Sequence, residues 1–205
     1  AKLLHASKYD WFDVTEEAEE ELIEAVLREA VLESGNQALA QTAKNQYFLY
    51  RMSKILKTTV RTLGEQVRAG HFKPEDFELS FVFTDELSAV NFALTDEEKM
   101  HLRGRIDRVD TYEADGKLYV KVIDYKSGHT SFDLLALYHG LQLQLVVYLN
   151  AAVEVLKKKH PDEEVLPAGI FYYHIDDPVI EGSGQESDVE IYDQVLEKLK
   201  LDGLV

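Results

Sequence analysis

Residues 101–128, HLRGRIDRVDTYEADGKLYVKVIDYKSG, decide the fold. Two runs of alternating apolar residues, 101–112 and 117–126, flank the pair Asp115-Gly116. Asp-Gly between such runs is the strongest short-range signal for a β-hairpin, because a type I′ turn requires positive φ at both central residues. The sequence therefore predicts two antiparallel strands joined by a two-residue turn.

The turn also determines which residues face each other. Counting outward from Asp115-Gly116 places Asp107 directly opposite Asp124, with β-carbons about 4.5–5.5 Å apart. Like charges at that distance destabilise a sheet, so we expect a cation between them. Mg²⁺ suits this position, because it is commonly held by one or two carboxylates together with waters and substrate phosphate. Period-two alternation puts Lys126 on the same face as Asp124, about 7 Å along the strand.

The residues that lead up to Asp124 make a solvent-facing position costly, because they are apolar and share its face. They are Leu118, Val120 and Val122. Three other interpretations of the pair stay open. Either aspartate faces solvent, Arg105 or Arg108 forms a cross-strand salt bridge with it, or a β-bulge shifts the register by one residue.

Helical and strand periods surround the hairpin. Thr15 before an acidic run is typical of a helix start, and Pro74 interrupts the helical pattern. The expected elements are a helix from about 16 to 34, an amphipathic helix over 36–69, a strand over 77–83, a helix over 132–159 packed across the sheet, a strand over 168–174, an acidic surface loop over 181–190, and a last helix. This order predicts an α/β or α+β fold with a mixed β-sheet flanked by helices. Residues 1–73 form its N-terminal helical extension and residues 74–205 its core, within one domain.

Composition limits the chemistry and the location of the chain. The 205 residues contain no cysteine, which excludes disulfides and an iron–sulfur cluster within this segment and leaves carboxylates and histidines as metal ligands. Hard metals are therefore favoured. There is no apolar run of eighteen residues and no signal-peptide pattern, so we expect a cytoplasmic protein without a membrane segment.

The net charge of −16 argues against nucleic acid, whose backbone is normally bound by lysine and arginine. The charges are unevenly distributed, however. Residues 41–73 carry seven basic side chains and one acidic one, whereas residues 1–40, 74–98 and 161–205 supply the acidic excess. A polyanion could bind the basic stretch and avoid the rest. The alternative is a solvated basic helix face paired with acidic neighbours.

Four stretches, taken in order, resemble the PD-(D/E)XK nucleases. They are 104–110 (GRIDRVD), 122–128 (VIDYKSG), 140–149 (GLQLQLVVYL) and 169–173 (GIFYY). More narrowly, the set is similar to the C-terminal nuclease domain of AddB subunits of AddAB-type helicase–nucleases, relatives of the RecB nuclease domain. The resemblance covers most of the chain and implies a restriction-endonuclease-like core.

The resemblance implies roles for individual residues. Asp107 and Asp124 would ligate Mg²⁺, or Mn²⁺, together with the backbone carbonyl of Tyr125. Lys126 would orient or activate the attacking water. Glu78 matches the acidic position of the first strand and would complete the metal shell; the alternative is an ordinary glutamate at a strand edge.

Further residues would support the site or contact DNA. Gln144 and Tyr148 lie four apart on one helix face and would contact DNA or the attacking water, the alternative being ordinary surface and core positions. Arg105 and Arg108 would help to hold the DNA backbone. The family carries cysteines for an iron–sulfur cluster and an upstream histidine that His5 does not match. We therefore expect a fragment of a larger subunit.

The resemblance implies a Mg²⁺-dependent DNA exonuclease for DNA-end processing and recombinational repair. Its substrate would be a single-stranded DNA end, and its partner an AddA-type helicase–nuclease subunit. The chain has no GxxxxGK[ST] motif, so ATP binding is not encoded in it. A non-catalytic scaffold for DNA binding or subunit assembly, retaining the nuclease fold, is the alternative.

Overall fold

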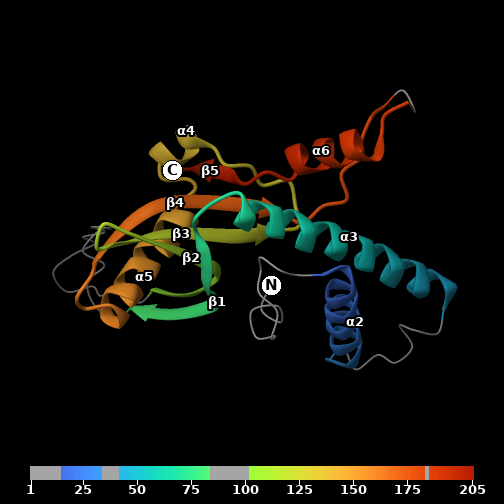
Figure 1. Ribbon diagram of the computed structural model, residues 1–205. Coiled ribbons are helices and arrows are strands. Elements are labelled where there is room, and N and C mark those ends of the chain that lie inside the picture. Colours follow the sequence, from blue (N-terminus) through green and yellow to red (C-terminus); the bar gives the residue numbers. More distant parts are fainter. Residues whose placement is uncertain (1–14, 34–41, 84–101, 183–184) are drawn as a thin grey trace. The chain divides into compact units, whose positions relative to one another are not determined.

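The computed structural model describes residues 15–33, 42–83, 102–182 and 185–205, with the backbone alone at 16, 33, 83 and 102 (Figure 1). The described residues form two compact units. One unit contains the described residues up to Gly70 together with Ile175–Lys200, and the other contains His71–His174 and Leu201–Val205. The boundary predicted from the sequence lies at residue 73 and assigns all later residues to the core. The contacts in the structure instead group residues 175–200 with the first helices.

The second unit is a mixed five-stranded sheet with the strand order β1-β2-β3-β4-β5. β1, β2 and β3 are antiparallel to one another, β4 is parallel to β3, and β5 is antiparallel to β4. The strands span β1 (Lys73–Phe83), β2 (Leu102–Ala114), β3 (Lys117–Lys126), β4 (Glu164–His174) and β5 (Asp202–Leu204). The predicted mixed sheet with flanking helices is confirmed.

The β2–β3 hairpin forms at the predicted turn. Asp115 has a φ of 52° and Gly116 a φ of 73°, as a type I′ turn requires. The strands pair without a register shift from Ala114 opposite Lys117 to Arg108 opposite Ile123. The predicted register therefore holds along the whole ladder, and no bulge intervenes before the two aspartates.

The apolar stripe of β3 packs under α5 (Gln144–Lys159), which lies across one face of the sheet (Figure 1). Leu118, Val120 and Val122 join Leu145 and Leu156 of the helix in one buried cluster. Burial of this apolar area stabilises the unit. It also holds β3 against the helix that starts beside the end of the strand.

The single helix predicted over 132–159 is wrong, because the structure divides it. α4 (Leu134–Tyr138) ends at His139, and α5 begins only at Gln144. Gly140 between them has a φ of 74°, a conformation that ends a helix and that glycine adopts at little cost. The helical spacing of apolar residues continues on both sides of Gly140, so the sequence pattern gave no sign of the break.

Two strand boundaries also differ from the prediction. β1 starts at Lys73 and includes Pro74, next to a register shift between Pro74 and Asp76. Proline is tolerated there because β1 is an edge strand, where a missing N–H removes no essential ladder bond. β4 starts at Glu164 rather than 168. β5 was not predicted, since three residues carry too little pattern.

The first unit is helical and consists of α2 (Glu16–Glu33), α3 (Ala43–Arg68) and α6 (Asp188–Lys198). Thr15 caps α2 by accepting a hydrogen bond from the amide of Ala18, as predicted. α6 starts at a capping box of Ser187 and Glu190, inside the stretch that was predicted to be a loop. Residues 36–41, the start of the predicted second helix, lie outside the described residues.

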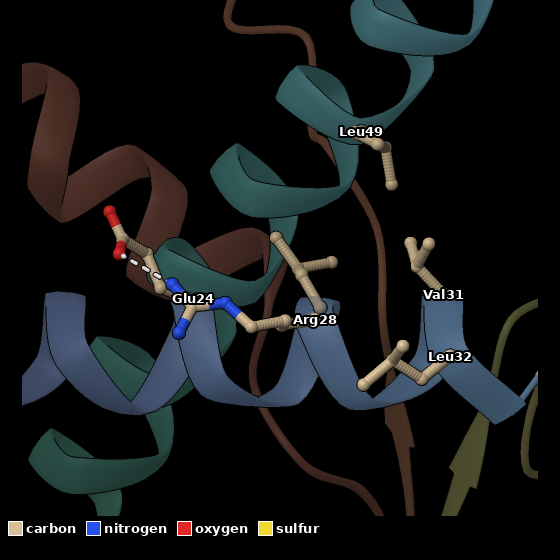
Figure 2. Close-up of a pocket in the computed structure, with 6 residues that line it drawn as sticks. Glu24, Arg28, Val31, Leu32 and Leu49 are labelled. Carbon is tan, nitrogen blue, oxygen red and sulfur yellow. Dashed lines mark ion pairs between the residues drawn. The ribbon is translucent and has the colours of Figure 1, made fainter. Parts of the chain in front are cut away.

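Side chains of α2 and α3 pack against each other. Glu19, which is buried, accepts a hydrogen bond from Arg61 at 3.1 Å, and Lys57 donates to Glu20 at 2.7 Å. Farther along the pair, Val31 of α2 and Leu49 of α3 line an apolar pocket of about 360 Å³ (Figure 2). Among the residues that the structure describes, no helix is long and apolar enough to cross a membrane.

We expect Gly116→Ala to destabilise the sheet unit by about 1–2 kcal/mol, because alanine is strained in the left-handed conformation of this turn. The free energy of unfolding from urea denaturation measures the loss. Gly128→Ala is the matched control, since an added Cβ there meets open space, and it should change stability by no more than about 0.5 kcal/mol. Equal effects of the two substitutions would contradict the type I′ turn.

Candidate active site

Asp107 and Asp124 occupy the position next to the last ladder pair of the hairpin, Arg108 opposite Ile123. The amide of Tyr125 donates a hydrogen bond of 2.9 Å to Oδ2 of Asp107. The carboxylate of β2 is thus tied to the residue that follows Asp124 on β3. Asp124 itself is buried, with 4% of its surface exposed.

A hydrogen-bonded chain links the end of β3 to the start of α5. Lys126 Nζ lies 2.7 Å from Asp124 Oδ2 and donates to Gln144 Oε1 at 3.1 Å. Gln144 Nε2 lies 3.3 Å from Asp124 Oδ1 and donates to Tyr148 Oη at 3.0 Å. Four residues that the sequence singled out therefore lie in one cluster, and the first turn of α5 sits beside them. No side chain caps that turn, so its amides leave positive partial charge near the carboxylates.

Tyr172 belongs to the same cluster and was missed by sequence reasoning. It lies across from Asp124 in the parallel β3–β4 ladder, and its ring centroid is 5.4 Å from Lys126 Nζ. Burial raises the pKa of Tyr172, so its hydroxyl stays protonated. The hairpin turn determines the register of β2 and β3 only, and a parallel pairing through a long connection has no equivalent local signal.

Burial dominates the electrostatics of the carboxylate pair. It raises the pKa of Asp124, Lys126 partly offsets this effect, and the charge of Asp107 adds to it. Burial alone would lower the pKa of Lys126, but the hydrogen bond and charge of Asp124 outweigh it and raise that pKa. Lys126 is therefore a cation at neutral pH, and its charge compensates only part of the burial of Asp124.

The pair is suited to a divalent metal ion. Oδ2 of Asp124 is inaccessible to solvent and accepts no aligned hydrogen bond beyond its contact with the Lys126 ammonium. Two carboxylates match the ligand set of Mg²⁺, which completes its octahedron with waters and phosphate oxygens. Within the described ranges, no three acidic, histidine or cysteine side chains lie close enough together to hold a metal. Two carboxylates are what this site provides in the present side-chain arrangement.

Glu78 lies in line with the pair on the neighbouring strand, but its carboxylate does not join the two aspartates in a group that could hold a metal. The β1–β2 ladder pairs Phe77 with Arg108 and Leu79 with Ile106, which puts Glu78 across from Asp107. Its φ of 53° is in the left-handed region, uncommon for a residue other than glycine. Its carboxylate lies 4.0 Å from Arg105 Nη1. A third-ligand role for Glu78 stays a proposal that requires its side chain to rotate toward Asp107.

The two arginines of the strand have different environments. Arg105 is exposed, as a contact with DNA requires. Arg108 is 2% exposed, and its guanidinium donates two hydrogen bonds to Asp110, at 2.5 and 2.8 Å. The predicted DNA contact by Arg108 is therefore wrong, because a buried and paired guanidinium cannot reach a phosphate. Its supporting role is the part compatible with the structure.

Arg108 belongs to a buried polar cluster on the face of the strand opposite Asp107. Lys121 Nζ lies 3.2 Å from Oδ2 of Asp110, which is fully buried. Burial and the neighbouring guanidinium of Arg108 affect the pKa of Tyr125 in opposite directions, and the net pKa is raised. The Tyr125 side chain thus extends toward Arg108, while its amide holds Asp107. Asp110, within the motif 104–110, was not assigned a role from sequence.

The segment after Lys126 is held by β4 and β5. Asp202 Oδ2 accepts a hydrogen bond of 2.7 Å from the amide of Phe132, and His174 Nδ1 lies 3.2 Å from the carbonyl oxygen of Gly128. These contacts restrain the backbone that leaves the candidate site. Asp202 was missed, because it lies on the short strand that the sequence pattern did not reveal.

Comparison with known proteins identifies relatives over the full chain. The model of the PD-(D/E)XK nuclease superfamily matches residues 2–204. A relative from Lachnoclostridium phytofermentans, named as the B subunit of an ATP-dependent helicase/deoxyribonuclease, is 45% identical over 100% of this chain and 16% of its own length. Proteins with the same name from Alkaliphilus metalliredigens and Clostridium acetobutylicum are 40% and 37% identical, over 95% and 96% of this chain and 17% of their own length. The chain thus spans about one sixth of the length of these curated relatives.

We expect Arg108→Ala to lower the free energy of unfolding by about 3–5 kcal/mol, because it leaves the buried Asp110 without its bidentate partner. Arg108→Lys keeps the charge but loses the two-pronged geometry, so its loss should be intermediate. The exposed Arg105→Ala is the control and should stay within about 0.5 kcal/mol of the wild type. Urea denaturation measures the free energy of unfolding of each variant. If Arg108→Ala loses no more stability than Arg105→Ala, the Arg108–Asp110 pair does not stabilise the sheet.

Proposed function

The chain belongs to the PD-(D/E)XK nuclease superfamily, and from this membership we propose that it hydrolyses phosphodiester bonds of DNA in a Mg²⁺-dependent reaction. The single observation that carries the proposal is the meeting of Asp107 with Asp124, with Lys126 in contact with the second carboxylate. These are the residue types that a metal-assisted phosphodiester hydrolysis needs.

The metal would be held by the carboxylates of Asp107 and Asp124 and by the backbone carbonyl of Tyr125, with Glu78 joining when its side chain rotates. Mg²⁺, or Mn²⁺ in its place, would lower the pKa of the attacking water and would place positive charge beside the phosphate. The burial of Asp124, which Lys126 compensates only in part, supports this assignment, because a divalent ion would relieve the remainder. The exposed surface of Glu78 leaves room for such a rotation.

Lys126 would act as a cation rather than as a base. Because Asp124 keeps its ammonium protonated, the side chain would orient the attacking water by hydrogen bonding and stabilise negative charge developing on the phosphate. Gln144 would fix the position of Lys126 by accepting a hydrogen bond from its ammonium group. Tyr148 Oη accepts from Gln144, so its own proton remains available for the substrate or for water.

The proposed role in the cell is exonucleolytic cleavage of single-stranded DNA ends within a larger helicase–nuclease. The names of the relatives include both activities, and an AddA-type subunit would be the partner. The proposal places the domain in DNA-end processing and recombinational repair. The exposed Arg105 would contact the DNA backbone near the carboxylates, without reading sequence.

We expect Lys126→Ala to reduce cleavage of end-labelled linear single-stranded DNA in Mg²⁺ by about 100-fold or more, the usual cost of removing a charge-stabilising group from a hydrolytic site. Lys117→Ala is the matched control, since that lysine lies on the same strand and pairs at the surface with Glu164. It should cleave at the wild-type rate. EDTA should abolish cleavage by every variant.

Two outcomes would contradict the proposal. Equal products from wild type and Lys126→Ala would remove Lys126 from the reaction. A wild-type protein that binds DNA in a salt-sensitive manner, cleaves nothing in Mg²⁺ or Mn²⁺, and binds equally well after Asp124→Ala would be a non-catalytic scaffold with a nuclease fold. Thermal denaturation of each variant verifies that a lost activity is not a lost fold.

A further inference from the structure

The first half of α3 carries a stripe of exposed aromatic and basic side chains. Tyr47, Tyr50, Arg51 and Lys54 follow the spacing i, i+3, i+4, i+7, which places them on one face of the helix. We refer to these four residues as the aromatic stripe. Tyr47 is 63% exposed and Tyr50 is 64% exposed, so both rings are largely accessible.

The aromatic stripe lies away from the apolar contact between α3 and α2. Leu49 of α3 turns toward the pocket lined by α2 residues, including Val31 (Figure 2), whereas Tyr47 and Tyr50 are largely exposed. The burial of two large rings would normally stabilise a helix of this kind. Their exposure within the helical unit leaves both rings accessible to another molecule.

The charge around the aromatic stripe favours a polyanion. Residues 42–64 contain no aspartate or glutamate and five basic side chains, in a chain whose net charge is −16. Two of the five, Lys57 and Arg61, already pair with Glu20 and Glu19 of α2. Arg51 has an acidic neighbour, Asp177, at 3.5 Å, and both side chains are substantially exposed. An exposed pair of this type contributes little, so a phosphate could replace Asp177 at small cost.

We propose that the aromatic stripe binds single-stranded DNA, with bases stacked on Tyr47 and Tyr50 and phosphates held by Arg51 and Lys54. The proposal rests on the proposed DNA substrate and adds a binding surface separate from the carboxylate site. Stacking platforms combined with positive charge are the general means of binding single strands without sequence preference, since every base has a π-face. A duplex keeps its bases paired and stacked and could use only the two cations.

The spacing of the two tyrosines suits this mode of binding. Residues three apart on a helix have β-carbons about 5–6 Å from each other, which allows each ring to meet a different base of one strand. Arg51 directly follows Tyr50, and Lys54 lies one further turn along the same face. The two cations thus lie to one side of the two rings. A phosphate of the strand could contact a cation while the neighbouring base stacks on a ring.

The test measures binding in EDTA, so that cleavage does not interfere. Fluorescence anisotropy of a labelled oligo-dT strand is recorded with wild type, with Tyr47→Ala/Tyr50→Ala, and with Tyr47→Phe/Tyr50→Phe. Loss of two stacked bases should weaken binding of the alanine variant by about 10-fold or more. The phenylalanine variant keeps both rings and should bind within about twofold of the wild type.

Two controls isolate stacking from other effects. Tyr138→Ala removes a tyrosine that is 83% exposed in the other unit and should leave the affinity unchanged. An abasic strand of equal length offers no base to stack, so it should bind weakly, and with the same affinity, to the wild type and to the alanine variant.

The double variant Arg51→Ala/Lys54→Ala tests the phosphate contacts. It should reduce the salt dependence of binding, with the slope of log K against log salt falling by about 0.7 for each lost contact.

Equal affinity of wild type and the alanine variant for oligo-dT overturns the proposal and points to a protein partner for this face. An equally large loss in the phenylalanine variant also overturns it, because a hydroxyl rather than a ring would then be responsible. The outcome is independent of the cleavage assay with Lys126→Ala. A catalytic failure with intact stacking, or the reverse, is therefore recognisable.

Discussion

The hydrogen bond from the Tyr125 amide to Asp107 is the contact on which the rest of the site depends. It joins the two strands at the point where their ladder ends, and it brings one carboxylate beside the other. The turn at Asp115-Gly116 sets the register that makes this bond possible, and the Arg108–Asp110 pair supports Tyr125 from the opposite face. A local turn thus determines the geometry of a site about eight residues away along each strand.

The parts of the molecule that depend on local rules could be predicted from the sequence. The hairpin, its register and the shared face of Asp124 and Lys126 all follow from turn geometry and period-two alternation. Gln144 and Tyr148 came from the family resemblance, and the structure brings both to Lys126 and Asp124. The carboxylate pair was therefore accessible without any knowledge of the tertiary structure.

The parts that depend on long-range packing could not be predicted in this way. Tyr172 reaches the cluster through a parallel pairing, and Asp202 lies on a strand of three residues. The sequence pattern did not show that Arg108 faces the interior. Alternation divides the residues of a central strand between two faces, but it does not show that a face carrying charged side chains is buried. The helix break at Gly140 was hidden by apolar residues that kept the helical period on both sides.

The central claim is that Asp107 and Asp124 together hold a divalent ion. A crystal of the domain soaked in Mn²⁺, measured at a wavelength where manganese scatters anomalously, tests it most directly. We predict one anomalous peak at the site formed by Asp107 and Asp124, the residues that would hold the ion, and no such peak in an Asp124→Asn crystal. A peak elsewhere, or the same peak after Asp124→Asn, would contradict the claim.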